Sequence, residues 1–475
     1  MSAAQPRRAF AAVDLGATSG RVMIGRVGAD LLELEQVARF PNGPVRRQDG
    51  LHWDFEALVE HVLDGLAEAV RREPAIESIG IDTWAVDYGL LQGDALRAEP
   101  FHYRDERGAR GVDMVHARVP FAELYARNGL QFLPFTTLYQ LAADDGAAEA
   151  ETALLVPDLV AHRITGVRVA ERTNASTTGL LGVHDREWDV ALAERIGIRA
   201  GLLPPLIDPG QRIGPLLPAV AARIGADLPV VAVGSHDTAS AVAAAPLASP
   251  STAYISCGTW GLVGLELDEP VLTDAARDAG FTHELGVDGR IRFLHNVTGL
   301  WLLTETVRAW EAEDGAPIDL PELLARAAAA DPAGPMFDAN DPSLSAPGDM
   351  PARIRAVVRA SGSEPPTDRA AFVRLVVESI AQAFADALGA AAELTGRTIE
   401  AIDLIGGGSL NRLLCQATAD RSGLPVLAGP VEATALGNVL VQARAAAAFG
   451  ADASLAQLRD LVLRTHPPVH YAPRG

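Results

Sequence analysis

One local pattern occurs twice in this chain, about half its length apart. The first copy is AAVDLGATSGRVMIG at residues 11–25, and the second is TAYISCGTWGLVGLE at residues 252–266. In each copy an apolar run of strand length enters a turn of Gly and Thr and leaves as a second apolar run. Glycine lets backbone N–H groups approach a bound anion closely, and a Thr or Ser hydroxyl adds a donor. The repeat predicts two turns that face each other and grip the phosphates of one nucleotide, although an unrelated β-hairpin also explains either turn alone.

The chain contains no lysine, so all 40 of its basic residues are arginine. A Walker A loop and a protein-kinase site each need a lysine at the phosphates, and Schiff-base or pyridoxal-phosphate chemistry needs a lysine amine. These classes are excluded, even if genomic base bias is the origin of the missing lysine. A Rossmann dinucleotide site has no support either, because no G-x-G-x-x-G motif follows an expected strand.

Length and charge limit the organisation and the partners. A chain of 475 residues exceeds what one hydrophobic core usually serves, so two domains are expected. The formal net charge of −21 argues against a nucleic acid or an anionic membrane as partner. An anionic nucleotide must then be held by local groups, namely backbone N–H groups, a metal ion and a few arginines.

The sequence predicts a cytoplasmic location. The apolar stretch near the N-terminus ends at Asp14, which is too short for a signal peptide, and there is no apolar run of about 18 residues to span a bilayer. The two cysteines, Cys257 and Cys415, fit a reducing compartment, and Cys257 is expected to be a buried thiol. The histidines are scattered without a zinc-binding pattern, so a protein-held zinc is not expected.

Alternating strand and helix patterns predict an α/β fold. Three strands are expected between residues 10 and 40, followed by a helix whose apolar positions run from Phe55 to Val70 after an N-cap at Asp54. The later expected strands are SIGID (78–82), PVVAV (229–233), AIDLI (401–405) and LPVLAG (424–429), which would be the last strand. Two long helical stretches are expected after the second turn, and the later one has an apolar face from Phe372 to Leu388. A further helix is expected to begin at Ser409.

The segment VGSHDTA, residues 233–239, is the best candidate for chemistry. It follows an apolar strand, so His236 and Asp237 are expected at a strand end near the middle of the chain. A carboxylate there can accept the proton of a substrate hydroxyl as that hydroxyl attacks a phosphoryl group. An Asx-turn or a helix N-cap is the alternative explanation for an aspartate in such a turn.

Three consecutive glycines, residues 406–408, stand between an expected strand and an expected helix. Helix N-terminal N–H groups would lie beside any ligand there, and the missing side chains leave a flat surface for a base and a ribose. Close packing of helix on strand explains the same glycines equally well.

Many segments, in order and over roughly residues 10–445, resemble the FGGY family of carbohydrate kinases. They are DLGATSGR, SIGIDTWAVDYGLL, FHYRDER, QFLPFTTLYQL, PDLVAHRITG, RTNASTTGLL, SHDTASAV, SCGTWGL, NVTGLWLL, GGGSLN and GPVEATALGN. Within the family, DTWAVDYGLL, NASTT and GLWLL are more similar to the kinases of L-rhamnulose than to glycerol or xylulose kinases.

The resemblance implies two ribonuclease-H-like lobes of the actin/hexokinase superfamily, each with a mixed five-stranded sheet, hinged around a nucleotide and sugar cleft. Residues 1–245 would form the lobe that binds sugar and phosphate, and residues 246–475 the lobe that binds the nucleotide. The duplicated strand–turn–strand is what such a fold would show.

The resemblance also implies roles for particular residues. Asp237 would be the catalytic base, and Asp14 would face Mg²⁺ through water, since Mg²⁺ keeps most of its hydration shell. The sugar would touch Ala85 through its backbone, His236, Asp237, Thr238 and Asn296. The ATP would touch Ala17, Thr18, Ser19, Gly20 and Arg21 from the first lobe, and Thr259, Thr304 and Gly407 from the second.

Two positions depart from the family pattern. Ala85 stands where Gly is common and adds a methyl group near the sugar, which leaves the exact sugar open. Thr304 stands where Gln is common and is shorter on the nucleotide side. Among the aromatic residues, Trp84, Phe132, Phe135 and Tyr139 are candidates for an apolar wall around a deoxy-sugar methyl group, with core packing as the alternative. YRDER (103–107) offers sugar donors or a charged surface turn.

The implied reaction is ATP- and Mg²⁺-dependent phosphorylation of O1 of a ketose, with L-rhamnulose as the first candidate. L-fuculose, L-ribulose and L-xylulose are the alternatives within the family. An alternative of another class is a nucleotide-driven conformational switch like actin and the heat-shock ATPases, which would hydrolyse ATP without sugar. The expected partners are therefore a small-molecule sugar and ATP.

Overall fold

The computed structural model describes residues 7–345, 348–450 and 452–474, and these residues form two compact units. Unit 1 comprises Met1–Ala244, Leu267–Arg292 and Ala433–Thr465, within the described residues. Unit 2 comprises Ala245–Glu266, Phe293–Glu432 and His466–Gly475, with the same restriction. The chain therefore passes between the units several times.

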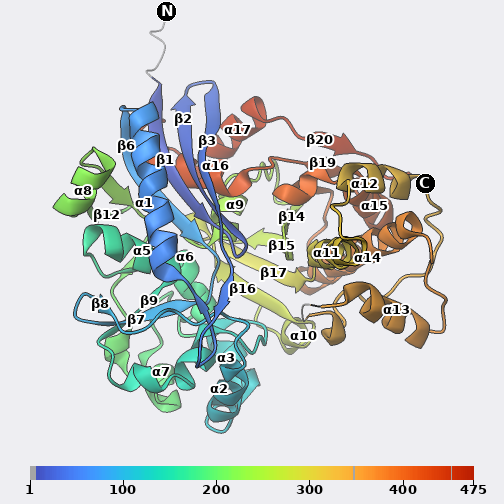
Figure 1. Ribbon diagram of the computed structural model, residues 1–475, viewed down its shortest axis with the longest axis horizontal. Coiled ribbons are helices and arrows are strands. Elements are labelled where there is room, and N and C mark those ends of the chain that lie inside the picture. Colours follow the sequence, from blue (N-terminus) through green and yellow to red (C-terminus); the bar gives the residue numbers. More distant parts are fainter. Residues whose placement is uncertain (1–6, 346–347, 451, 475) are drawn as a thin grey trace, which may run out of the picture. The chain divides into compact units, whose positions relative to one another are not determined.

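Unit 1 is built on a mixed sheet of six strands (Figure 1). Their order is β12 (Arg212–Pro215), β13 (Pro229–Val231), β6 (Ile76–Thr83), β1 (Arg8–Leu15), β2 (Ser19–Gly28) and β3 (Leu31–Pro41). Strands β1, β2 and β3 are antiparallel neighbours, as the three strands expected over residues 10–40 require. Strand β6 runs parallel to β1 and β13 parallel to β6, while β12 is antiparallel to β13.

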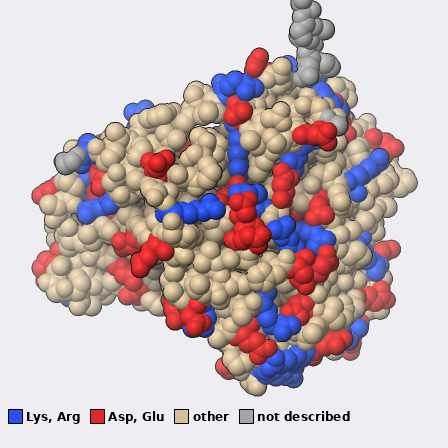
Figure 2. All heavy atoms as spheres, turned by 180° about the vertical axis from the view of Figure 1, so that it is seen from behind, with Lys and Arg blue, Asp and Glu red and all other residues tan. Residues whose placement is uncertain are grey.

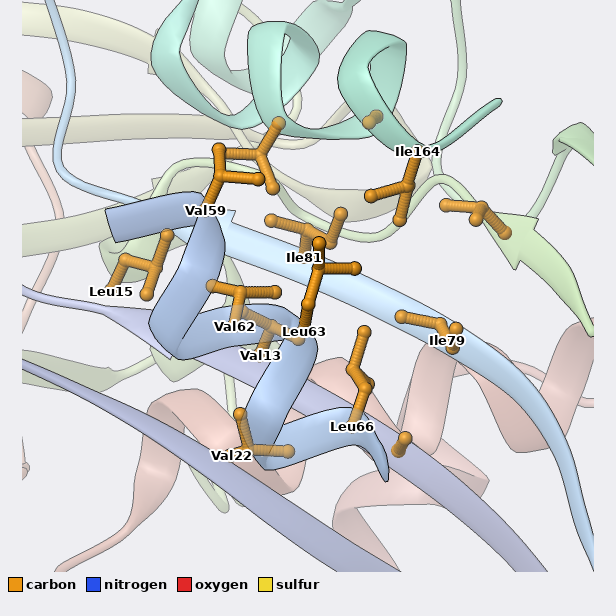
Figure 3. Packing of buried hydrophobic residues seen from close by; sticks show 14 of the residues in the cluster. Val13, Leu15, Val22, Val59, Val62, Leu63, Leu66, Ile79, Ile81 and Ile164 are labelled. Carbon is orange, nitrogen blue, oxygen red and sulfur yellow. The ribbon is translucent and has the colours of Figure 1, made fainter. Parts of the chain in front are cut away.

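Helix α1 (Phe55–Arg72) covers one face of this sheet. It starts where expected, because the Asp54 carboxylate accepts a hydrogen bond from the Ala57 N–H as an N-cap. Figure 3 shows the apolar side of α1, with Val62 and Leu66, facing Val13 of β1. Helix α5 (Val156–Thr165) adds Ile164 to the same core.

The opposite face of the sheet is covered by α16 (Ala433–Ala445) and α17 (Leu455–Thr465). Successive side chains of a strand point to opposite faces, so Phe10 and Ala12 of β1 pack with Val439 of α16, while Val13 packs with α1. A Cβ at Gly25 would lie 2.3 Å from Val439, so α16 lies directly on the backbone of β2.

The compact units differ from the expected cut of the chain at residue 245. Residues 267–292 and 433–465, which that cut assigns to the second lobe, belong to unit 1. Residues 433–465 belong to unit 1 because α16 and α17 bury their apolar sides on β1, β2 and β3.

Unit 2 repeats the same strand arrangement. Its neighbouring strands are β17 (Ile291–Val297), β15 (Gly261–Leu267), β14 (Thr252–Cys257), β18 (Ala401–Ile405), β19 (Val426–Ala428) and β20 (Val469–Tyr471). An antiparallel pair, β14 and β15, is followed by β18 and β19 in parallel and by β20 in antiparallel orientation. The repeat seen in the sequence is thus a repeat of sheet topology.

The sheets are larger than the five strands that the resemblance implied. In unit 1 the edge strand β12 is added to β13, and in unit 2 the edge strand β20 is added to β19. The prediction that residues 424–429 form the last strand is therefore wrong, because β20 follows some 40 residues later. Its three residues are largely exposed and carry no apolar alternation that would mark a strand.

Helices α11 (Trp301–Asp314), α12 (Leu320–Ala328), α13 (Met350–Ala360), α14 (Arg369–Thr395) and α15 (Arg412–Ser422) complete unit 2. The apolar face expected from Phe372 to Leu388 is buried in α14. Among the described residues, α14 alone is long and apolar enough to cross a membrane, and 61% of its most apolar window is buried inside the protein. It packs against α12 and α15, as a core helix does.

The remaining segments of unit 1 form small sheets and short helices. They are β4 (Pro44–Arg46), β5 (Leu51–Trp53), β7 (Tyr88–Gln92), β8 (Ala95–Leu96), α2 (Arg107–His116), α3 (Phe121–Asn128), α4 (Thr137–Ala142), β9 (Thr152–Leu155), β10 (Ala170–Glu171), α6 (Arg172–Ala175), α7 (Val190–Ile196), β11 (Leu206–Ile207), α8 (Pro218–Ile224), α9 (Asp237–Ala243) and α10 (Asp274–Asp278). Strand β16 (Phe281–Leu285) belongs to none of these small sheets, because it is the strand next to β17 at the end of the seven-stranded order. On the face shown in Figure 2, arginine and acidic side chains are interspersed rather than gathered into a basic patch.

Candidate active site

Asp237 is the first residue of α9, directly after a segment that runs beside β6. His236 forms a parallel β-bridge with Thr83, and the Thr83 N–H donates to the Ser235 carbonyl over 2.8 Å. The Asp237 Oδ1 atom accepts from the Thr238 N–H at 2.5 Å and is 3.1 Å from the Thr238 hydroxyl. One third of the Asp237 side chain is exposed (33%), so its carboxylate remains accessible for chemistry.

Asp14 lies at the end of β1, opposite Arg21 in the β1–β2 ladder. The Asp14 side chain is buried, and its Oδ2 atom is 2.5 Å from Nη2 of Arg21. The intervening turn is closed by a hydrogen bond from the Gly16 N–H to the Ser19 carbonyl and is tied to Asn42, whose side-chain amide donates to the Gly16 carbonyl.

The residues of this turn differ in what they offer a ligand. Thr18 is exposed, while Ala17, Ser19 and Arg21 are half-buried. Gly20 is buried, and a Cβ there would lie 2.2 Å from the ring of Phe40. The lack of a side chain at position 20 is therefore explained by packing alone, whereas Thr18 is free to meet a phosphate.

Asp82 is a carboxyl group that the sequence analysis did not single out. It pairs in register with Asp14 on the parallel strand β6 and is fully buried. The Asn438 amide donates to Asp82 Oδ2 over 2.6 Å, while Oδ1 has no hydrogen-bond partner among the described residues. Its position at the end of a strand beside β1 was the signal that could have identified it.

The electrostatics of Asp82 show that three carboxyl groups are neighbours. Burial raises the pKa of Asp82 well above its usual value, and the negative charges of Asp14 and Asp237 raise it further, against the bond from Asn438. A divalent cation would relieve this repulsion. Among the described residues, however, no group of three His, Cys, Asp or Glu side chains is arranged to hold a metal ion. The arrangement suits a cation that meets its carboxylates through water.

A buried polar network holds the Asp82 side of the sheet to α16. Gln442 donates to the Asn438 side-chain oxygen over 2.6 Å and to the Ala11 carbonyl over 3.0 Å. The Ser78 hydroxyl donates to Gln442 Oε1 over 2.7 Å. Side-chain alternation puts Ser78 and Asp82 on the same face of β6, which is the face that α16 covers.

Ala85 lies just beyond β6, in a turn with unusual backbone geometry. Val86 has φ of 69°, a left-handed conformation that a β-branched residue rarely adopts. Its carbonyl oxygen accepts from the Thr137 hydroxyl over 2.7 Å, and the Trp84 N–H donates to the Leu15 carbonyl. The Ala85 backbone is thus held beside the end of β1, near the segment that carries Asp237.

The Asp87 carboxylate holds this turn in place by accepting hydrogen bonds from the residues around it. Its Oδ2 atom accepts hydrogen bonds from the indole N–H groups of Trp53 and Trp84 and from the Tyr103 N–H, and Oδ1 accepts from Gln140. Burial raises the pKa of Asp87 to about 6 in spite of these bonds. Asp87 was another residue that the sequence analysis did not single out.

The pH dependence of stability is expected to change when Asp87 is replaced by Asn. The folded state binds the Asp87 proton more tightly than the unfolded state does. The free energy of unfolding that this proton contributes is therefore fully present at low pH and is lost as pH rises from about 4 to 6. A difference of about two pKa units corresponds to a loss on the order of 3 kcal/mol. Urea unfolding of Asp87→Asn and wild type at pH values below and above this window measures it.

The difference in free energy of unfolding between wild type and Asp87→Asn removes the contributions of the other titratable groups. The free energy of unfolding of wild type minus that of Asp87→Asn should be larger at the lower pH, whereas Asp113→Asn, an exposed control on α2, should show no such change. A constant difference for Asp87→Asn across the window would contradict the prediction.

The candidate aromatic wall is divided between two clusters. Trp84 is buried against Trp53, with ring centroids 4.1 Å apart. Tyr139 is also buried, so for these two residues the core alternative is correct. Phe132 is 44% exposed and packs on Tyr139, while Phe135 is half-buried beside Tyr103. Arg107 of the YRDER segment is a structural residue, since it pairs with Asp144 at 3.0 Å.

The candidate nucleotide residues of unit 2 gather around the β14–β15 turn. The Trp301 N–H donates to the Thr259 carbonyl over 3.1 Å, which ties the turn to the start of α11, and Thr304 is exposed one turn further along that helix. A Cβ at Gly408 would lie 2.4 Å from Cys257 Sγ, so the glycine loop packs on the end of β14. Gly407 is exposed, and a Cβ there would meet nothing within 4 Å.

Other predicted details of unit 2 are corrected or confirmed. The helix does not begin at Ser409, because residues Gly407–Leu410 form a 3-10 turn and α15 starts at Arg412, with Asn411 as N-cap. The Ser409 hydroxyl instead donates to the Gly406 carbonyl. The Cys257 thiol is buried as expected, and burial raises its pKa to about 12. Asn296 is the penultimate residue of β17.

A cavity of about 380 Å³ lies elsewhere in unit 1 and contains none of the predicted site residues. Its lining includes Arg172, Arg186, Asp208 and Asp288. The candidate site is therefore defined by its side chains and not by this cavity.

The fold is shared with solved sugar kinases. The gluconate kinase from Lactobacillus acidophilus superimposes with a TM-score of 0.78 at 16% identity, covering 99% of this chain and 94% of that one. The xylulose kinase from the same organism gives 0.78 at 16% identity, covering 98% and 94%. The repeated sheet with its glycine turns is thus the two-domain fold of a sugar kinase.

Sequence comparison makes the assignment more specific. The chain matches the N-terminal domain of the FGGY family of carbohydrate kinases over residues 9–244 and the C-terminal domain over residues 253–446. It is 38% identical over 472 residues to the rhamnulokinase of Bacteroides thetaiotaomicron, covering 98% of this chain and 96% of that protein. The rhamnulokinase of Pectobacterium carotovorum is 39% identical over 472 residues, with 98% and 93% covered.

The chain belongs to the FGGY family of carbohydrate kinases and is an ATP:sugar phosphotransferase. This membership removes the alternative of a nucleotide-driven switch that needs no sugar.

Proposed function

We propose that this enzyme transfers the γ-phosphoryl group of ATP to O1 of L-rhamnulose in the cytoplasm, as a step of L-rhamnose breakdown. The observation that carries the proposal is the 38–39% identity to rhamnulokinases over 98% of the chain. The segment from Asp82 to Leu91 supports it, because DTWAVDYGLL is one of the segments that resemble the kinases of L-rhamnulose more than glycerol or xylulose kinases, and Thr83 forms a β-bridge with His236 beside the candidate base.

In the proposed reaction Asp237 accepts the O1 proton as the hydroxyl attacks the phosphoryl group. Its carboxylate is accessible, which a general base requires. His236, Thr238, Asn296 and the Ala85 backbone position the sugar hydroxyls. The buried Asp87 keeps the Ala85 turn in place, so it acts on the sugar indirectly.

The phosphates are proposed to meet Ala17–Arg21 and Thr259, with Gly407 beside the adenosine and Thr304 nearby. A magnesium ion bound with ATP would neutralise charge on the phosphoryl oxygens. Asp14 and Asp82 would face that ion through water, because their neighbouring negative charges favour a cation there. Residues 1–245 would thus supply most of the groups for sugar and phosphate, while residues 246–475 would supply the nucleotide groups together with Asn296 and Thr259.

The sugar specificity is expected to favour L-rhamnulose over ketoses that lack its 6-methyl group. One buried methyl group allows roughly 10- to 200-fold preference in kcat/KM, and hydroxyl stereochemistry read by His236 and Asn296 can discriminate more strongly. The measurement is kcat/KM with ATP for L-rhamnulose, L-fuculose, L-ribulose, L-xylulose and glycerol. A tenfold advantage of any other sugar over L-rhamnulose would keep the kinase assignment and overturn the sugar assignment.

The variant Ala85→Gly tests whether the methyl group of Ala85 affects which sugar the enzyme prefers. It removes the one methyl group by which this turn departs from the common family pattern. Because that methyl group lies beside the proposed sugar position, the order of kcat/KM among the four ketoses and glycerol should change in Ala85→Gly while the KM for ATP stays the same.

A further inference from the structure

The ring of His236 is enclosed by charged side chains of unit 1. Nη2 of Arg292 lies 2.9 Å from His236 Nδ1, and Glu284 Oε2 lies 3.2 Å from the same nitrogen. On the other side of the ring, Nε2 lies 3.4 Å from Oδ1 of Asp237. The imidazole therefore stands between a buried ion pair and the candidate base.

The ion pair comes from two consecutive strands. Glu284 lies on β16 and Arg292 on β17, with 3.0 Å between Oε2 and Nη2. Arg292 also donates from Nε and Nη2 to the Leu285 carbonyl, and the Leu285 N–H donates to the Ser176 hydroxyl. These bonds fix the guanidinium beside the ring.

The chain just before His236 is fixed separately. Glu171 Oε2 accepts from both the N–H and the hydroxyl of Ser235, at 3.0 and 2.7 Å. The imidazole is thus held through its own backbone and through the guanidinium at Nδ1.

Stability alone does not explain this arrangement. Arg292 has no exposed surface, and its Nη1 atom has no hydrogen-bond partner among the described residues. A buried ion pair often contributes less than apolar residues of the same volume, and an unmet donor adds a further cost. Such a pair next to a functional side chain points to a role in positioning it.

The chemistry of the contact selects one form of the imidazole. A guanidinium group only donates and a carboxylate only accepts, so Nδ1 can either accept from Arg292 or donate to Glu284 Oε2. The contact with Nη2 of Arg292 is the shorter of the two, and Glu284 Oε2 forms no hydrogen bond among the described residues, so Nδ1 is assigned as the acceptor. A neutral imidazole that accepts at Nδ1 carries its proton at Nε2. The Nε2–H group is then directed toward Asp237 and the space in front of it. Burial opposes ionisation of Glu284, but the positive charge of Arg292 and the neighbouring His236 ring lower the pKa of its carboxyl group.

We propose that Arg292 and Glu284 are positioning residues that hold His236 as its Nε2–H tautomer. Arg292 donates to Nδ1, and Glu284 balances the charge of Arg292. The Nε2–H group so fixed faces the Asp237 carboxylate in the free enzyme and donates to a sugar hydroxyl when the sugar is bound. This inference rests on the proposed roles of His236 and Asp237 in sugar binding and proton transfer.

The test uses a double variant because each single change leaves a buried charge without its partner. Arg292→Met combined with Glu284→Gln removes both charges and keeps the volumes. Arg292→Lys keeps a cationic donor and serves as the conservative variant. Arg444→Met combined with Asp288→Asn removes a more exposed ion pair of the same unit, with 2.7 Å between its charged atoms, and serves as the control.

The kinetic measurement distinguishes an effect on the KM for sugar from an effect on kcat. In the double variant the KM for sugar should rise by roughly 3- to 10-fold, the effect of one misplaced hydrogen bond, while the KM for ATP stays unchanged. Arg292→Lys should recover part of this loss, and the control should match wild type. A purely structural role would lower the active fraction, and therefore the apparent kcat, without moving the KM for sugar, and that result would overturn the proposal.

A second readout does not depend on any activity. In protein labelled with ¹⁵N-histidine, the His236 signals are identified by their absence from His236→Gln. Wild type should show a bare Nδ1 and a protonated Nε2, and the double variant should lose this preference. A protonated Nδ1 in wild type would overturn the tautomer assignment, whereas inactive wild type with the expected spectrum would count against the proposed function alone.

Discussion

Replacing Asp237 by Asn is expected to lower kcat by roughly 10²- to 10⁴-fold, the contribution of a positioned general base. The amide keeps the shape of the carboxylate and the acceptor for the Thr238 N–H. It cannot accept the proton of the sugar O1. The KM values for sugar and ATP should therefore stay within a few-fold of wild type, as steady-state kinetics with L-rhamnulose will measure.

A matched change elsewhere in unit 1 controls for the loss of one negative charge. Asp227→Asn lies on an exposed loop and should leave kcat unchanged. Near-normal turnover of folded Asp237→Asn would remove Asp237 from the role of base and leave the family assignment intact.

Replacing Gly437 by Ala is expected to reduce both stability and activity. A Cβ at this position of α16 would lie 1.8 Å from the Ser240 carbonyl oxygen of α9, which is backbone and cannot move alone. Overpacking of this kind costs about 1–3 kcal/mol and sometimes more. Because Asp237 begins α9, a shift of that helix should also lower kcat, which unfolding curves and kinetics will measure together.

Gly389→Ala is the matched control, since Gly389 is an exposed helical glycine of α14 whose Cβ would meet nothing within 4 Å. It should be stabilising by up to about 1 kcal/mol through helix propensity alone. Equal stability changes in the two variants would show that α16 and α9 are not in the close contact described.

The parts of the fold that the sequence predicted are those with a local signal. The turn after Asp14, the N-cap at Asp54 and the apolar face of α14 all depend on neighbouring residues, and each is found where expected. The repeated topology of the two sheets follows from the same local pattern read twice.

No local sequence signal predicted that α16 packs in unit 1. An apolar helix shows that it is buried but not which sheet it covers, so Val439 and Gly437 could not be assigned to β2 and α9 from their spacing. The edge strands β12 and β20 were missed for a related reason, because each is short and depends on one neighbour.

The candidate site was predicted in part. The resemblance supplied Asp14, His236 and Asp237, which unit 1 carries on neighbouring segments. Asp82, Glu284 and Arg292 were missed because an isolated acidic or basic residue in a strand has no pattern of its own. Their pairing became visible only when parallel register and a two-strand hairpin brought them beside the predicted residues.

The packing of α16 sets an order of events during synthesis. The face of β1 and β2 that carries Phe10, Ala12 and Met23 is sealed by residues 433–445, which leave the ribosome some 400 residues after the strands they cover. A growing chain that has completed residues 1–245 therefore still exposes a broad apolar surface next to Asp14 and Asp82. Unit 1 can reach its final form only near the end of translation, when residues 433–465 become available to cover this surface.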